Sequence, residues 1–268
     1  MERPSWAPIG IDMDSPSPAR MYDYHLGGVH NFQVDRDVAE QMAAVMPDLP
    51  LILRANRAFL LRAVRFLAYA GIRQFLDLGS GIPTVENVHE IAQRIAPESR
   101  IAYVDADPVA VAHSRELLRD NPYATAVQAD LRNVAGVLRA PEVSALIDFS
   151  QPVGLLMVAV LHFVSDSDDV DSVLAGYRHA LAPGSYLAIS HAAGDRDALP
   201  EGADQARTIY SRRVSELTLR SRAEVTTMFD SLDLVNPGVV PIEEWHPNNH
   251  LPRLGLTGWV GVARKPVR

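Results

Sequence analysis

Short apolar runs alternate with amphipathic stretches along most of the chain after residue 71. Apolar runs of this kind are typical of strands buried on both faces of a sheet, and apolar residues at helical spacing indicate helices. The pattern predicts strands near residues 72–78, 100–105, 124–129, 153–160, 185–191, 232–240 and 256–264. It predicts helices near residues 84–96, 108–119, 132–139, 168–182, 202–213 and 221–230. This alternation favours an α/β fold, with a doubly wound and mostly parallel sheet.

The two ends of the chain depart from this alternation. The last two predicted strands have no helix between them, and the segment that joins them contains prolines, so they are expected to form an antiparallel hairpin with an irregular connection. Before residue 71, helices are predicted over residues 34–46 and 51–70, and Gly71 ends the second of them. We therefore expect a seven-stranded sheet with an antiparallel C-terminal strand, to which N-terminal helices are added.

The composition of the chain excludes several kinds of functional site. The chain has no cysteine, which excludes disulfides and zinc–thiolate sites, and Lys265 is its one lysine, which excludes a phosphate loop of the Gly-Lys-Ser/Thr type. A net charge of −8 disfavours a broad nucleic-acid surface. The longest apolar-rich run, residues 51–70, carries four arginines and is not expected to span a membrane. Residues 1–20 lack the apolar core of a signal peptide, so a cytoplasmic location is expected.

A glycine turn, Gly79-Ser80-Gly81, follows the first predicted strand. Glycine allows positive φ and, having no Cβ, lets a ligand approach the backbone closely. Pro83 suits the first turn of a following helix, whose N-terminus presents free N–H groups to a ligand. Alone, such a turn also occurs in purely structural loops, so its context decides the interpretation.

Asp105 supplies that context. It ends the second predicted strand, 24 residues beyond Gly81, close to the spacing of the acid that binds ribose hydroxyls in nucleotide-binding βαβ units. The structural alternative is that Asp105 caps the next helix. Asp107 is the better cap, because it directly precedes Pro108, which leaves Asp105 for a ligand.

Further polar residues lie at other predicted strand ends and near the N-terminus. Asp130 follows the third strand, where it can bind a ligand or cap a helix. His162 follows the fourth strand, where it can face the cleft or simply pack in the core. Residues 19–33 are rich in aromatic residues, histidine and glycine, and form either a surface loop or a lid over the cleft.

These motifs resemble those of class I S-adenosylmethionine (SAM) methyltransferases. The matching strings are Asp77-x-Gly79-x-Gly81, residues 104–108 (Val-Asp-Ala-Asp-Pro) and residues 129–131 (Ala-Asp-Leu). Longer segments resemble more closely a stand-alone S-adenosyl methyltransferase family that was long catalogued as a domain of unknown function; they are residues 19–28, 31–32, 54–57, 81–84, 87–90 and 158–163. The resemblance extends from Pro18 to Lys265. Pro83 stands where the broad class has a third glycine, but it agrees with the narrower family.

The resemblance implies a Rossmann-like class I methyltransferase fold, SAM as cofactor and S-adenosylhomocysteine as product. No residue is assigned as a metal ligand, and the sequence does not establish whether the activity depends on a metal. It implies that residues 1–70 form a leader, a lid and helices packed on a SAM-binding domain of residues 71–268. Its implied cofactor-binding residues are Tyr22, Asn31, Arg57, Asp77, Gly79, Ser80, Gly81, Pro83, Thr84, Asp105, Ala106, Asp130, Leu131 and His162. Asp77 would support the turn or the cofactor ammonium, Asp105 would bind the ribose, and Asp130 would accept from the adenine amino group. Tyr24 and His162 are the candidates for a catalytic role.

Two other functions remain open at this point. A nicotinamide-dependent oxidoreductase would use the same turn and Asp105, but Thr84 replaces its third glycine and the chain has no Tyr-x-x-x-Lys pair. A SAM-binding sensor or interaction protein would keep the fold without turnover. We expect a methyltransferase that acts on a small-molecule acceptor, with no nucleic acid or membrane as partner. The sequence identifies neither the acceptor nor the oligomeric state.

Overall fold

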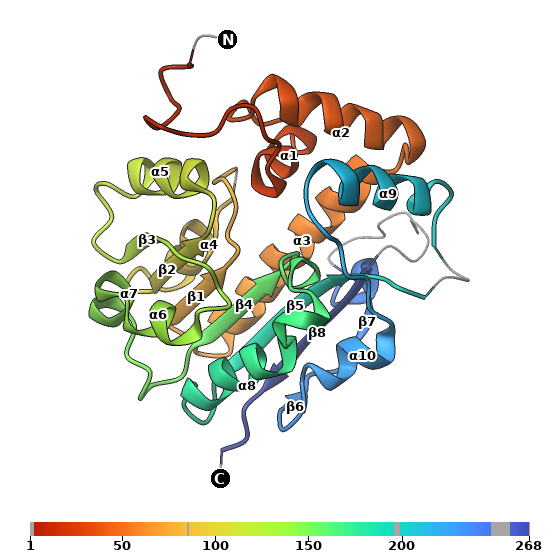
Figure 1. The fold of residues 1–268 in the computed structure, drawn as a ribbon. Coiled ribbons are helices and arrows are strands. Elements are labelled where there is room, and N and C mark those ends of the chain that lie inside the picture. The colour runs from red at the N-terminus through yellow and green to blue at the C-terminus, as the bar shows by residue number, and fades with distance from the viewer. Residues whose placement is uncertain (1–2, 85, 196–198, 248–257, 268) are drawn as a thin grey trace.

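A single mixed sheet forms the centre of the protein in a computed structural model, which describes residues 3–84, 86–195, 199–247 and 258–267 (Figure 1). Its strand order is β3-β2-β1-β4-β5-β8-β6, with β7 also paired to β8. The strands are β1 (Gln74–Leu78), β2 (Arg100–Asp105), β3 (Ala124–Gln128), β4 (Gly154–Val158), β5 (Tyr186–Ala192), β6 (Asp233–Leu234), β7 (Val240–Pro241) and β8 (Gly258–Arg264). Strands β1 to β5 are parallel, and β8 is antiparallel to β5. The prediction of a mostly parallel sheet with an antiparallel C-terminal strand is confirmed.

Helices cover both faces of this sheet. One face packs against α3 (Leu49–Tyr69), α4 (Val88–Ile95) and α5 (Pro108–Leu117). The other face packs against α6 (Val134–Arg139), α7 (Pro141–Leu146), α8 (Val170–Ala180) and α10 (Arg222–Thr227). The strands between them are buried on both sides: every residue of β1 and of β4 is buried, including the polar Gln74 and Asp77 of β1. No helix in the described ranges is long and apolar enough to cross a membrane.

Four local expectations are wrong. The helix predicted from residue 84 begins at Val88, because Asn87 and Glu90 form a capping box there, so Pro83 lies in the preceding loop. The strand predicted over 232–240 is two short strands, β6 and β7, separated by a segment that contains Pro237 and Gly238. Residues 141–146 form α7, which was not predicted, and the 19–33 segment begins with helix α1 (Pro18–His25). Val85 and the predicted strand residues 256 and 257 lie outside the described residues.

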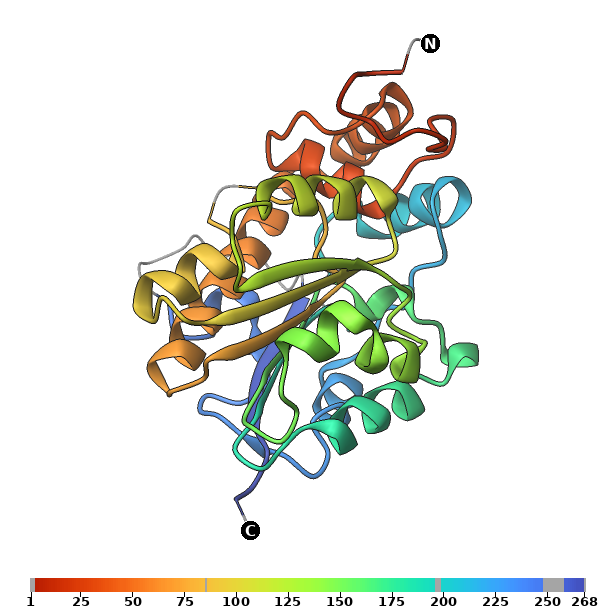
Figure 2. The same cartoon turned by 90° about the vertical axis from the view of Figure 1, so that its left-hand side faces the viewer.

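Three helices form a roof over one end of the sheet: α1, α2 (Gln33–Val45) and α9 (Ala203–Arg213). Figures 1 and 2 show α9, from late in the chain, beside the two N-terminal helices. The three helices share an apolar cluster with the start of α3, to which Met21, Met42, Ile52 and Tyr210 contribute. The roof is therefore built from both the first and the last third of the chain, and the division into residues 1–70 and 71–268 stays a prediction.

A buried carboxylate fixes α1 in this roof. Asp35 accepts hydrogen bonds from the Ser17 N–H, the Phe32 N–H and Arg20 Nε, each at 2.8 Å. Arg20 also lies 3.6 Å from Asp107 at the start of α5. Arg20 and Asp35 are both buried, so their relative geometry is more fixed than that of an exposed ion pair. Through it, α1 is attached to the sheet half of the molecule.

Gly202 sets the approach of α9 to α2. Its φ is +79°, and a Cβ there would lie 1.7 Å from the Val45 carbonyl oxygen. Gly202→Ala is therefore expected to push α9 outward and to lower the free energy of unfolding by about 1–2 kcal/mol. Gly238→Ala is the matched control, because Gly238 also has positive φ (+88°) but open space around its missing Cβ. Thermal melts of both variants measure the difference, and equal melting temperatures would contradict the close packing at Gly202.

Candidate active site

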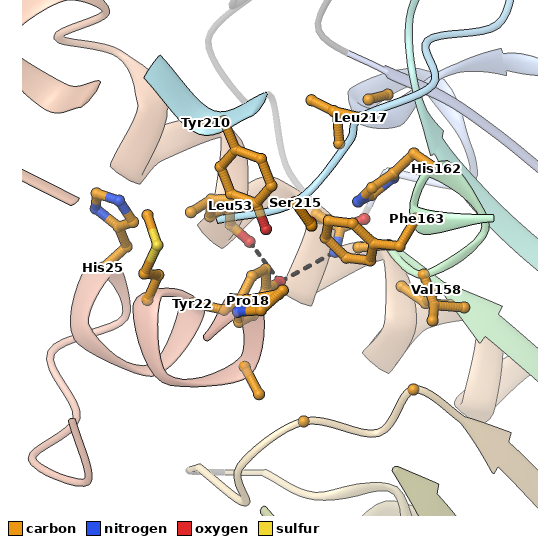
Figure 3. A pocket seen from close by; sticks show the side chains of 18 of the residues that line it. Pro18, Tyr22, His25, Leu53, Val158, His162, Phe163, Tyr210, Ser215 and Leu217 are labelled. Atoms are coloured by element: carbon orange, nitrogen blue, oxygen red, sulfur yellow. Dashed lines mark hydrogen bonds between the residues drawn. The ribbon is translucent and has the colours of Figure 1, made fainter. Parts of the chain in front are cut away.

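A cavity of about 640 Å³ lies between the carboxyl ends of the parallel strands and the roof helices (Figure 3). Its floor consists of the loops that follow β1 to β5, and its walls and roof come from α1, α2, α3 and α9 and the segment after α9. It brings together these predicted residues: Tyr22, Arg57, Asp77, Gly79, Ser80, Gly81, Asp105, Ala106, Asp130, Leu131 and His162. Ligands of open α/β sheets bind at this end of the strands.

The glycine turn requires glycine for two different reasons. Gly79 has φ +70°, and a Cβ there would lie 2.3 Å from Val160 Cγ2. Gly81 has φ +67°, but a Cβ there would meet nothing within 4 Å. Gly79 therefore lets the turn pack on the loop after β4, whereas Gly81 leaves space on the cavity side.

Asp105 joins the ends of β1 and β2. Its Oδ2 accepts from the Gly81 N–H at 2.7 Å, and its Oδ1 accepts from the Asp107 N–H at 2.8 Å. Burial raises the pKa of Asp105 to about 6. Asp107, not Asp105, caps α5 by accepting from the Val109 N–H at 2.7 Å, as predicted. Asp105 is thus held rigidly by two backbone donors at the cavity wall.

Asp77, in β1, is the second carboxylate of the floor. It is buried, and burial raises its pKa to about 7, although the nearby Arg57 guanidinium opposes this shift. Arg57 reaches the site from α3 and donates through Nη2 to the Glu86 carbonyl (3.0 Å) and to Asn87 Oδ1 (3.3 Å). A buried carboxylate that is half protonated near neutral pH favours a cationic ligand group beside it.

Asp130 is the exposed acid of the floor. It accepts from Arg132, with Oδ2 2.6 Å from Nη2, and Arg132 also lies 3.2 Å from Asp168. The hydrogen bond from Arg132 holds the pKa of Asp130 below its usual value. Asn133, not Asp130, caps α6, so the alternative of a capping role for Asp130 is wrong.

On the roof side, a buried hydrogen-bond chain links α1 to the sheet. The Tyr22 hydroxyl donates to the Leu53 carbonyl and accepts from Asn56 Nδ2, both at 3.0 Å. Asn56 Oδ1 in turn accepts from Ser190 Oγ of β5 at 2.5 Å. Figure 3 shows Tyr22 at the cavity wall, with its hydrogen bond to Leu53 drawn. The chain fixes the Tyr22 ring at the boundary between floor and roof.

Four predicted residues are absent from the described lining of this cavity. The Tyr24 hydroxyl donates to Glu40 at 2.8 Å near the protein surface. Asn31 is buried and donates to Asp23 (2.9 Å), which shapes the loop after α1. Pro83 lines a small neighbouring cavity, and the Thr84 N–H donates to the cap residue Asn87 at 3.1 Å. Tyr24 therefore does not line the cavity, and Asn31 and Thr84 form hydrogen bonds with neighbouring residues of the protein.

His162 lies in the short 3-10 turn η1 (Leu161–Phe163) after β4 and lines the cavity. Its Nδ1 is buried and has no hydrogen-bond partner among the described residues. The ring stands edge-on to His191 at 5.7 Å, and His191 Nε2 accepts from Arg220 at 3.1 Å. Burial, with His191 and Arg220 close by, holds the pKa of His162 well below its usual range, so its ring is neutral at neutral pH.

The sequence interpretation missed the roof side chains that line the cavity. Phe163, Tyr210 and Ser215 face it beside His162 (Figure 3). His25, at the end of α1, also lines it. Phe163 and His25 stood in segments that the sequence had singled out, but no local pattern marks Tyr210 or Ser215, because only tertiary packing brings α9 over the strand ends.

In comparisons with known proteins, residues 4–266 match the model of the S-adenosyl methyltransferase family. A candidate methyltransferase of Thermobifida fusca YX, known from a crystal structure, is 40% identical, with a TM-score of 0.93 over 98% of this chain and 100% of that one. A DUF574 family protein of Streptomyces avermitilis MA-4680 is also 40% identical, with a TM-score of 0.90 over 95% of this chain and 99% of that one. No curated protein matches the sequence.

More distant structures share the fold alone. Human N-acetylserotonin methyltransferase, solved with SAM, is 14% identical, with a TM-score of 0.52 over 92% of this chain and 62% of that one. The N-methyltransferase NodS of Bradyrhizobium japonicum WM9, solved with S-adenosylhomocysteine, is 13% identical, with a TM-score of 0.50 over 81% of this chain and 88% of that one. The family match over nearly the whole chain carries the assignment: the protein belongs to the S-adenosyl methyltransferase family and has the class I SAM-dependent methyltransferase fold.

Proposed function

We propose that this enzyme transfers the methyl group of SAM to a small-molecule acceptor bound under the roof helices. One observation carries the proposal: the glycine turn and the strand-end acids open into the same cavity as the apolar roof and His162. A donor on the floor and an acceptor under the roof would therefore meet inside one space that excludes water.

The floor residues fit SAM. At Gly81 the missing Cβ faces open space, which leaves room for the methionine part to approach the turn. Asp77 suits the ammonium, Asp105 suits the two ribose hydroxyls, and Asp130 suits the adenine amino group, because carboxylate oxygens accept from each of these donors. Leu131 and Ala106 supply apolar contact beside them.

Catalysis by this chain rests mainly on placement. Bound SAM supplies an electrophilic methyl carbon, so the protein needs to hold an acceptor atom in line with it and to exclude water. The Tyr22–Asn56–Ser190 chain and the buried Arg20–Asp35 pair keep the roof in place. His162 lines the cavity and its Nδ1 has no partner among the described residues, so its position makes it the candidate to accept a proton from the acceptor.

Calorimetry with SAM, S-adenosylhomocysteine and NADH tests the cofactor assignment and separates the rivals. We expect micromolar binding of SAM and S-adenosylhomocysteine that excess NADH leaves unchanged. Binding of NADH in place of SAM would support the oxidoreductase alternative. Tight SAM binding with no formation of S-adenosylhomocysteine across a broad panel of acceptors would support a sensor without turnover.

The affinity for SAM is expected to depend on pH through Asp77. An adjacent ammonium stabilises the ionised carboxylate, so SAM binding lowers the Asp77 pKa from about 7 and releases a proton. Affinity should therefore be full above pH 7 and fall by up to about tenfold per pH unit as the pH drops below 7. Titrations in two buffers of different ionisation enthalpy measure the released proton.

Asp77→Asn is the matched variant for this effect. It should weaken binding at pH 7.5 and flatten the pH dependence between pH 6 and 7, leaving only the part below about pH 6 that Asp105 contributes. A wild-type affinity that is constant from pH 5.5 to 7.5 would contradict the role of Asp77.

A further inference from the structure

The roof half of the cavity differs in chemistry from its floor. The charged lining residues lie at the strand ends or beside them, apart from Arg207, which is exposed at the rim on α9. Under the roof, the described lining is apolar, with Met21, Met42, Met46 and Leu217 among its members. Methionine side chains adapt to irregular apolar ligands. Apart from Arg207 at the rim, a charged ligand group would find no counter-ion among the described residues there.

A few polar atoms interrupt this apolar lining. His25 Nε2 and His162 Nδ1 are buried and lack a hydrogen-bond partner among the described residues, and the Tyr210 hydroxyl and Ser215 Oγ are buried beside one another. Tyr210 and His25 are each 7% exposed. Buried polar groups in folded proteins are almost always hydrogen-bonded, so the two histidine nitrogens without partners in one cavity indicate a ligand that supplies the partners.

These polar groups are all uncharged at neutral pH. Burial lowers the pKa of His25 and raises that of Tyr210, so the imidazole is unprotonated and the phenol protonated. His162 is neutral for the reason given above. The roof half therefore offers neutral donors and acceptors in apolar surroundings, which favours an uncharged ligand over an ionic one.

Aromatic rings line one side of the roof half. The rings of Phe163 and Tyr210 are stacked, at 21° and with centroids 6.0 Å apart, and the His162 ring stands edge-on to Phe163 at 4.3 Å. Figure 3 shows Phe163, Tyr210 and His162 around the same space, with Ser215 next to the Tyr210 hydroxyl. Aromatic walls of this kind favour planar apolar ligands.

We propose that the acceptor is an uncharged, planar and largely apolar molecule that presents a hydroxyl or amino group to His162 and a second polar group to Tyr210 and Ser215. This inference rests on the proposed function and narrows it to a substrate class. In the reaction, the acceptor oxygen or nitrogen forms a bond to the methyl carbon as the carbon–sulfur bond breaks and its electron pair goes to sulfur. The acceptor proton passes to His162 Nδ1 and then to water.

A pair of flat probes that differ by one charge tests the class. In the presence of S-adenosylhomocysteine, 2-naphthol is expected to bind at least tenfold more tightly than 6-hydroxy-2-naphthoate by calorimetry. Equal affinity, tighter binding of the carboxylate, or no binding of either probe would overturn the proposal. Formation of 2-methoxynaphthalene is a second readout.

Two variants test whether the naphthyl probes bind in the roof half of the cavity. Phe163→Ala should weaken 2-naphthol binding by about tenfold, because it removes one of the two stacked rings that line this side of the cavity. Tyr210→Phe keeps the ring and removes only the hydroxyl, so it should reduce the preference for 2,6-dihydroxynaphthalene over 2-naphthol while leaving 2-naphthol itself nearly unchanged. An unaltered preference in Tyr210→Phe would contradict the role of the hydroxyl.

A third variant should reverse the preference for the uncharged probe. Ser215→Lys places a cation beside the Tyr210 hydroxyl and is expected to shift the preference toward 6-hydroxy-2-naphthoate. In each variant, a SAM affinity equal to that of the wild type is the control for correct folding, since the floor residues are unchanged. If wild-type protein bound neither SAM nor S-adenosylhomocysteine, the proposed function would fail, whereas the preference between the two naphthyl probes would still report on the roof half.

Discussion

Asp105→Ala is expected to raise the Kd for SAM at least about 100-fold. The carboxylate is positioned to accept from both ribose hydroxyls, and each hydrogen bond to a charged group is worth about 1.5–3 kcal/mol, so losing two removes more than the 2.7 kcal/mol that 100-fold represents. Asp105 also holds the Gly81 and Asp107 N–H groups at 2.7 and 2.8 Å, so the turn loses its anchor as well. Calorimetry with SAM measures the change.

The control for Asp105→Ala is Asp120→Ala, an exposed acid after α5 that does not line the cavity. It removes the same charge and should leave the affinity within twofold of wild type. If Asp105→Ala bound SAM as tightly as Asp120→Ala, the floor assignment would be wrong. Circular dichroism and melting temperature in the absence of ligand establish that both variants are folded.

Gly79→Ala is expected mainly to lower stability, whereas Gly81→Ala is expected mainly to lower the affinity for SAM. Both positions have positive φ, which costs alanine about 1–2 kcal/mol. At Gly79 the methyl group also meets Val160 at 2.3 Å, adding about 1–3 kcal/mol of overpacking, so the melting temperature should fall by roughly 5–15 °C. At Gly81 the methyl group enters open cavity space, so stability should change little beyond the strain while SAM affinity falls steeply.

Thermal melts without ligand and calorimetry with SAM, applied to both variants, separate the two effects. The expected result is a crossed pattern: Gly79→Ala has the larger loss of stability, and Gly81→Ala keeps most of its stability but loses binding. Gly81→Ala with wild-type affinity would show that the cofactor does not approach this part of the turn. Equal melting temperatures would show that the contact with Val160 relaxes freely.

The sheet and its strand-end acids could be predicted because their signals are local. Each buried strand is one apolar run, and Gly79, Gly81 and Asp105 stand at fixed distances from the ends of such runs. Asp107 was correctly identified as the cap of α5 for the same reason, since a cap and its helix are adjacent in sequence. Where a functional residue directly follows a strand, the sequence alone predicts that it lies at the carboxyl end of that strand.

The roof could not be predicted because its contacts are not local. Helix α1 forms over residues that are mostly aromatic, polar or charged and have no helical apolar stripe, and its position depends on the buried Asp35. Tyr24 and Asn31 share a motif with Tyr22, but helix geometry turns only Tyr22 toward the cavity. The pairing of Tyr210 with Phe163 depends on α9 crossing the strand ends, which no spacing in the sequence encodes.

The composite roof also affects how the enzyme folds. The part of the floor assigned to SAM between Asp77 and Leu131 needs only strands β1 to β3, which are joined by short βα units. The roof depends on long-range contacts: Asn56, which holds Tyr22 of α1, bonds to Ser190 across 134 positions, and the apolar cluster of the roof joins Met21 to Tyr210. Closing such long loops is slow, so the roof should form last. During synthesis, the chain would then acquire the site for its methyl donor well before the site for its acceptor.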